Sequence, residues 1–336
     1  MRLFLCLLLL LPGAVLAQQR ASSTRPSAPR VATPALLATF AEFKGGVARY
    51  HTILFAPADS GRYQAVGGRG AWTLRDSTAW RVAERSSTYN RWTERFLFAE
   101  RPGIPADLRG IDVYNGEYCE GGRTQTLRFL GPRFVGYETV SQGACEGAAH
   151  PWQLRALAVA PIDSLDHPGL DLTLLTDADS DDLEAAAARN LSQLDASTAA
   201  RWLEIPDAAN WLPVRRDGMW KVQLRLDAID LASRGQVRDF TTDLKVPDTL
   251  FARVGADDLR RASRQVSGAR DAFLSPDGTI GVVRRPGLMT LHRIDRRRYG
   301  RALVGFPIAS GADLIQLRWL TRGEARRMER ALRRAG

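Results

Sequence analysis

The chain has 336 residues, and its 47 lysines and arginines outnumber 37 acidic residues, which gives a formal net charge of +10. This length suffices for one large or two ordinary domains with a buried core, and no apolar run approaches the roughly 18 to 20 residues of a membrane-spanning helix. Only three residues are lysine, so arginine carries the charge. That composition favours anionic partners, although a coding bias toward arginine accounts for it equally well.

Residues 1–17 combine one positive charge, a short apolar run and small residues up to Ala17. This pattern predicts a cleaved signal peptide and therefore an exported protein, periplasmic or extracellular. Cys6 lies within the apolar run and not at the cleavage end, which disfavours a lipid anchor. Residues 18–36 are rich in Ser, Thr, Pro, Ala and Arg, and this composition predicts a disordered tether.

Residues 37–160 are predicted to form a β-rich N-terminal domain. Short apolar runs alternate here with turn signals, a spacing that suits antiparallel meanders. The expected strands cover residues 48–56, 70–74, 80–83, 95–98, 124–129, 134–140 and 152–159.

Two cysteines remain once the signal peptide is removed, and an even pair in an oxidising compartment predicts a Cys119–Cys145 disulfide. In the chain-entropy model a bridge closing such a loop stabilises the fold by roughly 3 to 4 kcal/mol. The alternative is a reactive thiol, but neither cysteine has a CxxC partner or a local base.

Residues 161–336 are predicted to form a C-terminal α+β domain, which makes the whole chain α+β in class. Helical spacing begins near Asp181, and the acids before it suit a helix N-terminus. The same acids do not fit a calcium loop, because Asp182 stands where glycine is needed and Ala188 stands where a bidentate glutamate is needed.

Further strands are expected at residues 218–226, 238–246, 288–294, 302–308 and 314–320, with a hairpin over 271–283 whose turn is Asp277-Gly278. A repeat-type propeller is not expected, because Ser-Pro-Asp-Gly occurs once. Residues 321–334 predict an arginine-rich amphipathic helix that packs against the β body, with membrane contact as the alternative.

Two sets of residues are candidate sites. His150 precedes Pro151 in a Gly-Ala-Ala-His-Pro turn, and with Asp163 and His167 it could form a metal site or a general base; the alternative is a structural histidine. Tryptophan and arginine interleaved in the first half could stack on sugars and hold acidic groups, although burial in a β core is the favoured explanation of the tryptophans. The predicted binding residues are Trp72, Trp80, Trp92, Arg81, Arg91 and His150.

The order of features is similar to that of a known family. A strand over 134–140 precedes Gly147-Ala148-Ala149-His150-Pro151, followed by a strand through Ala158, an acidic turn into 172–177, a helix, and Phe273-Leu274-Ser275-Pro276-Asp277-Gly278. Over about residues 41–320 this resembles the extracytoplasmic domain of RsiV-type anti-sigma factors and the non-catalytic module of PdaC-type peptidoglycan deacetylases. The resemblance implies an α+β envelope-binding module. Ala148 departs from the usual glycine, and neither an anchor nor a deacetylase motif is found.

These observations predict an exported, monomeric, non-catalytic binding protein of a bacterial envelope, without a cofactor. The expected partner is peptidoglycan, another anionic envelope polymer or an envelope protein, and not nucleic acid. Lysozyme is a weaker candidate because two basic proteins repel. A metal-dependent hydrolase using His150, Asp163 and His167, and a structural assembly part without a small ligand, are the alternatives.

Overall fold

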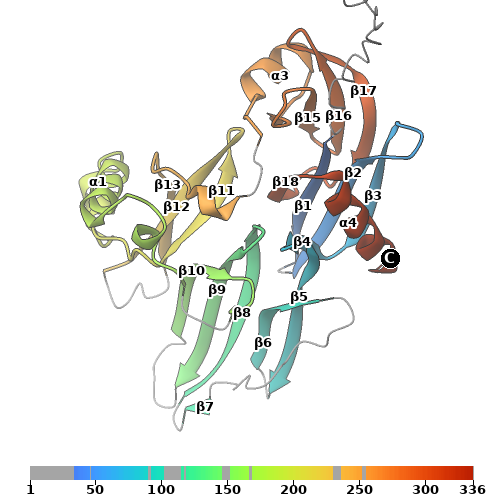
Figure 1. Cartoon of the computed structure of the whole chain (residues 1–336). Coiled ribbons are helices and arrows are strands. Elements are labelled where there is room, and N and C mark those ends of the chain that lie inside the picture. Colours follow the sequence, from blue (N-terminus) through green and yellow to red (C-terminus); the bar gives the residue numbers. More distant parts are fainter. Residues whose placement is uncertain are drawn as a thin grey trace, which may run out of the picture. The chain divides into compact units, whose positions relative to one another are not determined.

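Strands dominate the fold because short apolar runs are separated by turn residues along almost the whole chain (Figure 1). The computed structural model describes residues 34–45, 47–89, 92–101, 115–116, 119–145, 152–165, 169–229, 236–251 and 255–335. Of these residues, 56% lie in strands and 16% in helices. The predicted α+β class is therefore wrong, because the second half is built mainly of strands as well.

The strands are β1 (Ala35–Lys44), β2 (Val47–Pro57), β3 (Tyr63–Arg69), β4 (Ala71–Arg75), β5 (Thr78–Tyr89), β6 (Trp92–Glu100), β7 (Asn115–Gly116), β8 (Cys119–Leu130), β9 (Phe134–Cys145), β10 (Trp152–Pro161), β11 (Trp211–Arg216), β12 (Met219–Asp227), β13 (Val237–Thr241), β14 (Asp271–Leu274), β15 (Ile280–Arg285), β16 (Leu288–Asp295), β17 (Arg298–Pro307) and β18 (Asp313–Leu320). The helices are α1 (Ser180–Leu191), α2 (Ala196–Ala199), α3 (Leu259–Gln265) and α4 (Arg322–Ala335), with short 3-10 turns η1 (Leu172–Leu174) and η3 (Asp248–Leu250).

The strands form four sheets. The first has the order β18-β1-β2-β3, the second β10-β9-β8-β6-β5-β4 with β7 beside β8, the third β11-β12-β13, and the fourth β14-β15-β16-β17. All neighbours are antiparallel except β6 and β8, which meet in parallel at Arg95 and Thr124.

The sheets adopt a four-bladed, propeller-like arrangement. The last strand, β18, pairs with the first described strand, β1, with Ala35 opposite Leu320, so strands from the two ends of the described fold share one sheet. The sequence disfavoured only a repeat-type propeller, because Ser-Pro-Asp-Gly occurs once. The described sheets have four, seven, three and four strands, so they are not copies of one repeated unit.

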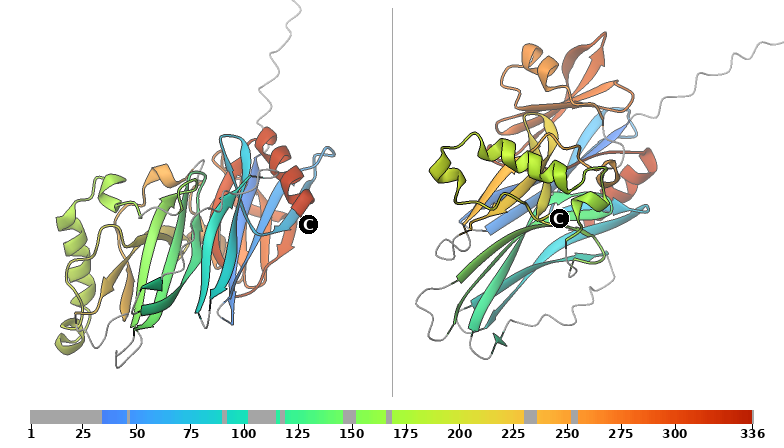
Figure 2. Two further views of the ribbon diagram at one scale, coloured as in Figure 1. Left: turned by 90° about the horizontal axis from the view of Figure 1, so that it is seen from below. Right: turned by 90° about the vertical axis from the view of Figure 1, so that its left-hand side faces the viewer.

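Hydrophobic clusters join neighbouring sheets. One cluster lies between the first and fourth sheets around Trp319 and Phe273, and another lies between the first and second sheets around Ile315 and Leu127. A third joins the second and third sheets and packs under α1 around Trp211. Figure 2 shows α1 at one end of these sheets and α4 at the other.

Residues Thr33–Gly336 cluster as one compact unit. Strand β1 starts at Ala35, so the last two residues of the predicted tether are buried strand residues. The predicted signal peptide and the rest of the tether, up to residue 33, lie outside the described residues.

Candidate functional site

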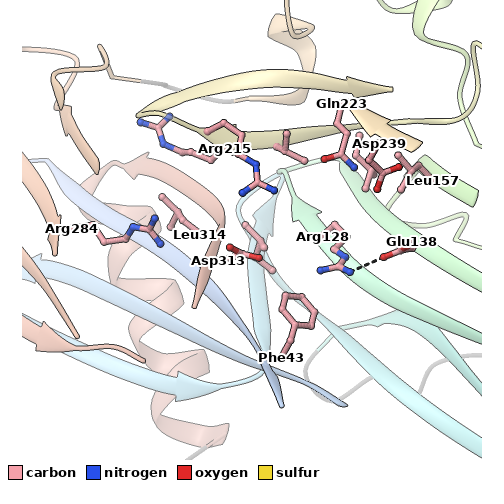
Figure 3. A pocket seen from close by; sticks show the side chains of 14 residues that line it. Phe43, Arg128, Glu138, Leu157, Arg215, Gln223, Asp239, Arg284, Asp313 and Leu314 are labelled. Carbon is pink, nitrogen blue, oxygen red and sulfur yellow. Dashed lines mark hydrogen bonds and ion pairs between the residues drawn. The ribbon is translucent and has the colours of Figure 1, made fainter. Parts of the chain in front are cut away.

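A cleft of about 180 Å³ lies where strands of all four sheets meet, and we call it the central cleft. Figure 3 shows its wall, with Arg215, Gln223 and Asp239 from the third sheet across from Phe43 and Asp313 from the first. The lining residues are Phe43, Arg128, Glu138, Leu157, Leu212, Val214, Arg215, Arg216, Gln223, Asp239, Arg284, Asp313, Leu314 and Ile315. Four of them are arginine and three are acidic.

Strand periodicity sets which side chains of the third sheet line the cleft. Alternate residues of a strand share a face, so Leu212, Val214 and Arg216 lie together on β11. Leu212 is opposite Gln223 on β12, which places Gln223 on the same face. Trp211, on the opposite face, belongs to the core under α1, to which Leu212 also contributes, and Arg215 on that opposite face still lines the cleft. One strand thus serves the core and the cleft at once.

Glu138 on β9 accepts hydrogen bonds from three arginines. Arg128 Nη2 donates to Oε2 at 2.6 Å, Arg225 Nη2 to Oε1 at 2.9 Å, and Arg155 Nη2 to Oε1 at 3.1 Å. Arg225 also makes a two-pronged pair with Asp239, at 2.6 and 2.8 Å. The side chain of Arg225 is 1% exposed, so these contacts compensate a charge that is almost fully out of water.

The arginines keep Glu138 ionised. Burial alone raises the pKa of a carboxyl group, but the hydrogen bonds and charges of Arg128 and Arg225 outweigh burial and lower the pKa of Glu138 from 4.5. Glu138 is therefore an acceptor that orients arginines. It is poorly suited to act as a general acid at neutral pH.

Other charged groups of the cleft have unused bonding capacity. Among the described residues no acidic side chain lies within ion-pair distance of Arg216 or Arg284, and no basic one within that distance of Asp313. Arg284 Nη1 donates to the backbone oxygen of Ala312 at 2.7 Å, whereas its buried Nε has no partner in the described part of the chain. The guanidinium of Arg128 stacks 4.3 Å from the ring centre of Phe43. These groups leave several donors for a ligand.

A second, polar cleft of about 540 Å³ continues from the first. It shares Arg216, Gln223 and Asp239 with the central cleft, and its remaining lining residues are Asn190, Gln193, Phe240 and Thr241. The two clefts therefore form one path from the middle of the sheets toward the end of α1. Amides, a hydroxyl and charged groups dominate this path.

Arg215 joins the third sheet to the fourth. Its Nε and Nη2 donate to Asp271 at 2.8 and 2.9 Å, and Nη2 also donates to Asp257 at 2.7 Å. Its side chain is 4% exposed and also lies over the Phe273 ring at 5.6 Å. The buried Arg215–Asp271 pair thus fixes one wall of the central cleft, as the Arg225–Glu138 pair does between the third and second sheets.

The predicted tryptophan and arginine residues lie elsewhere. Trp72 and Trp80 are 4% and 7% exposed and pack in two different hydrophobic clusters. Both tryptophans are therefore core residues and offer little surface to a sugar. Burial in the core was the explanation that the sequence favoured. Arg81 pairs with Glu100 at 3.2 Å and lies 5.9 Å from the Trp72 ring centre. Trp92 is a half-buried residue at the start of β6.

Three of the predicted site residues, Arg91, His150 and His167, lie outside the described residues. Asp163, the third member of the predicted metal set, receives a hydrogen bond from Arg75 Nη1 at 2.7 Å, which lowers the pKa of its carboxyl group. No group of three or more His, Cys, Asp or Glu side chains that could hold a metal occurs within the described ranges.

The two cysteines predicted to form a disulfide stand directly opposite each other, Cys119 on β8 and Cys145 on β9. Cys145 is disulfide-bonded. The side chain of Cys119 lies outside the described residues.

The central cleft was missed by sequence reasoning. Its residues come from nine strands that are far apart in sequence, and none belongs to a local motif. The available signal was a charged residue within an otherwise apolar strand, such as Glu138 in the run 134–140 or Arg225 in 218–226. A charge at such a position must be paired or must line a cavity.

No protein-family model matches this sequence, and no curated protein matches it either. No helix among the described residues is long and apolar enough to cross a membrane.

Proposed function

We propose that the protein is an exported, non-catalytic binding protein of the bacterial envelope, and that the central cleft binds an anionic wall glycan. The observation that carries the proposal is the set of unpaired arginines in a cleft built by all four sheets. Arg216 and Arg284 have no acidic partner among the described residues, whereas Arg215 and Arg225 nearby are paired with carboxylates. An arginine that is not neutralised within the protein is available to a carboxylate or phosphate.

The polar lining supports a glycan in particular. Gln223 and Asp239 in the central cleft, and Asn190 and Gln193 further along, can exchange hydrogen bonds with hydroxyl and acetamido groups. Phe43 supplies an apolar face for a sugar ring. The elongated path through both clefts suits a chain of sugars better than a compact metabolite.

The predicted signal peptide supports the envelope location, and the net charge of +10 supports attraction to an anionic wall. The α+β fold implied by the RsiV/PdaC resemblance is not the fold that the chain adopts. The proposal therefore relies on the cleft and not on that family.

A binding measurement tests the proposal. Soluble disaccharide-tetrapeptide fragments of peptidoglycan are titrated into the mature protein, the Arg216→Gln variant and the Arg298→Gln variant. Arg298 is also an exposed arginine, on β17 and outside both clefts, so it controls for net charge. Loss of one charge-assisted hydrogen bond weakens binding about tenfold or more. We expect that loss for R216Q and almost none for R298Q.

Two results would overturn the proposal: no binding of peptidoglycan fragments or of an acidic polysaccharide by the wild type, or equal weakening by both variants. The metal-dependent hydrolase with His150, Asp163 and His167 stays an alternative proposal. Stoichiometric metal in the purified protein that is lost in His150→Ala would favour it.

A further inference from the structure

A second arginine-lined site lies on the other end of the sheets, against α4. A pocket of about 360 Å³ is lined by Ser77, Thr78, Ala79, Arg101, Arg327, Arg330, Ala331 and Arg334. We call its four basic residues, Arg101, Arg327, Arg330 and Arg334, the α4 arginine cluster. None of the residues that line this pocket in the described part of the chain is acidic.

Helix geometry explains how three of these arginines converge. Residues three, four and seven apart share one side of an α-helix, so Arg327, Arg330 and Arg334 form a stripe along α4. Met328 and Leu332, on another side of the helix, are buried in the cluster that packs α4 on β1, β2 and β4. This packing places α4 against β4 and β5, and its arginine stripe lines a pocket together with Ser77 and Thr78 of the β4–β5 hairpin. Figure 1 shows α4 beside these strands.

The rest of the pocket comes from the second sheet. The turn between β4 and β5 has positive φ at Asp76 (45°) and Ser77 (66°), the conformation of a tight hairpin turn that suits strand twist. This turn brings the side chains of Ser77 and Thr78 to the pocket. Arg101 follows β6, and its guanidinium lies 4.5 Å from the ring centre of Trp80, which is itself buried.

The other arginines of α4 have acidic partners. Arg322 and Arg326 both lie 3.6 Å from Asp59, and Arg333 pairs with Glu329 at 2.8 Å. In contrast, no acidic side chain among the described residues pairs with any member of the α4 arginine cluster. Asp76, the acidic residue of the β4–β5 turn, lies within ion-pair distance of Arg75 and Arg133 instead.

We propose that the α4 arginine cluster binds a phosphate-bearing anion with at least two negative charges. Like charges three and four residues apart destabilise a helix, so the unpaired arginines of the stripe lower the stability of α4. A bound polyanion removes that repulsion. Among the described residues the buried Nε of Arg327 has no partner, so the site holds a donor that a ligand oxygen could satisfy.

The donor set selects phosphate over the ligand proposed for the central cleft. Four guanidinium groups and two hydroxyls supply many donors and no carboxylate acceptor. Phosphate oxygens accept several hydrogen bonds at once, and guanidinium groups bind them in two-pronged geometry. Neutral sugars also need acceptors, which the side chains of this pocket supply only through two hydroxyls.

Calorimetric titration with inorganic pyrophosphate tests this site. The key variant is R327Q/R330Q, and the matched control is R322Q/R326Q, which removes the same charge from the same helix at positions that face Asp59. We expect affinity for pyrophosphate to fall about tenfold or more in the first variant and about twofold or less in the second. If R327Q/R330Q fails to fold, Arg334→Gln replaces it, because Arg334 is exposed and its substitution should not disturb the core.

A wild type that does not bind pyrophosphate, or equal weakening in both double variants, would overturn the proposal. Sedimentation with vesicles of phosphatidylglycerol and of phosphatidylcholine identifies the source of the phosphate. Binding to the anionic vesicles that depends on Arg327 and Arg330 assigns a lipid headgroup, and pyrophosphate binding without vesicle binding assigns a soluble ligand. Peptidoglycan binding by R327Q/R330Q tests whether this site is independent of the central cleft. Unchanged peptidoglycan binding means that the two sites are independent, and lost binding would mean that they act together.

Discussion

Arginine has two different roles in this protein, in the network around Glu138 and in the α4 arginine cluster. Arg225 is 1% exposed and bonds to both Glu138 and Asp239, so its charge is compensated within the protein. Arg330 on α4 is exposed and has no acidic partner among the described residues. The comparison shows that the net charge says little about binding by itself. What matters is which arginines the fold leaves uncompensated.

The largest expected effect is a loss of stability when the network around Glu138 is disrupted. Replacing Arg225 by Met removes its bonds to Glu138, which keeps Arg128 and Arg155, and to Asp239, whose side chain is 38% exposed. Loss of hydrogen bonds to charged groups costs about 1.5 to 3 kcal/mol of unfolding free energy. Urea unfolding should show that loss for R225M, and a change of about 0.5 kcal/mol or less for the exposed control R298M. A loss below about 1 kcal/mol for R225M would contradict the view that Arg225 belongs to a buried network and differs in role from the exposed arginines.

Salt should affect the two regions differently. Raising NaCl from about 50 to about 500 mM shortens the screening length well below the spacing of exposed charges, while buried pairs are screened much less. Pyrophosphate affinity of the α4 arginine cluster is expected to fall about tenfold or more, whereas the stability loss caused by R225M should stay nearly constant. Titration and urea unfolding at both salt concentrations measure this. Parallel salt dependence would contradict the assignment of Arg225 to a buried network.

A smaller effect is expected from pH. The folded protein lowers the pKa of Glu138 below its unfolded value of 4.5. The unfolded chain therefore binds the proton more readily, so the stability from this group is present above the unfolded pKa and is lost as pH falls through the folded pKa. Unfolding free energies between about pH 6 and pH 3 should fall more steeply in the wild type than in E138Q. Equal slopes would show that Glu138 is not held ionised.

The smallest expected effect is a slight gain in stability when one arginine of the α4 arginine cluster is replaced. In ligand-free protein, Arg330→Gln removes repulsion with Arg327 three residues before it and Arg334 four residues after it. Each such pair destabilises a helix by about 0.2 to 0.5 kcal/mol, so R330Q should raise stability slightly while weakening pyrophosphate binding. Thermal unfolding without ligand measures the first effect. A decrease in stability would mean that Arg330 has a structural contact and is not held for a ligand.

The sequence predicted single elements better than their assembly. The hairpin at Asp277-Gly278, the strand before it and the C-terminal helix are confirmed, because turn chemistry and helical spacing are local signals. Strand β11 was missed because Pro213 argues against a strand, yet β11 pairs with β12 alone, and proline is tolerated on such an edge. Strand β1 was missed because it is buried on both faces and lacks alternation.

The closure between β1 and β18 joins residues almost a full chain length apart, and no local pattern encodes it. The central cleft depends on that closure and on the Arg215 bonds to the fourth sheet. For the same reason its residues could not be grouped from sequence, although each charged strand residue was visible. The α4 stripe was visible as helical spacing, but the turn and Arg101 that complete its pocket were not.

Hydrogen–deuterium exchange with and without soluble disaccharide-tetrapeptide fragments of peptidoglycan tests the central claim most directly, because it locates the bound ligand without a mutation. A glycan in the central cleft should slow exchange in β11, β12 and β18, whose residues line it from two sheets. Exchange in β4 and β5 should not change. Unchanged exchange of β11, β12 and β18 at saturating fragment, or protection confined to β4 and β5, would contradict the account.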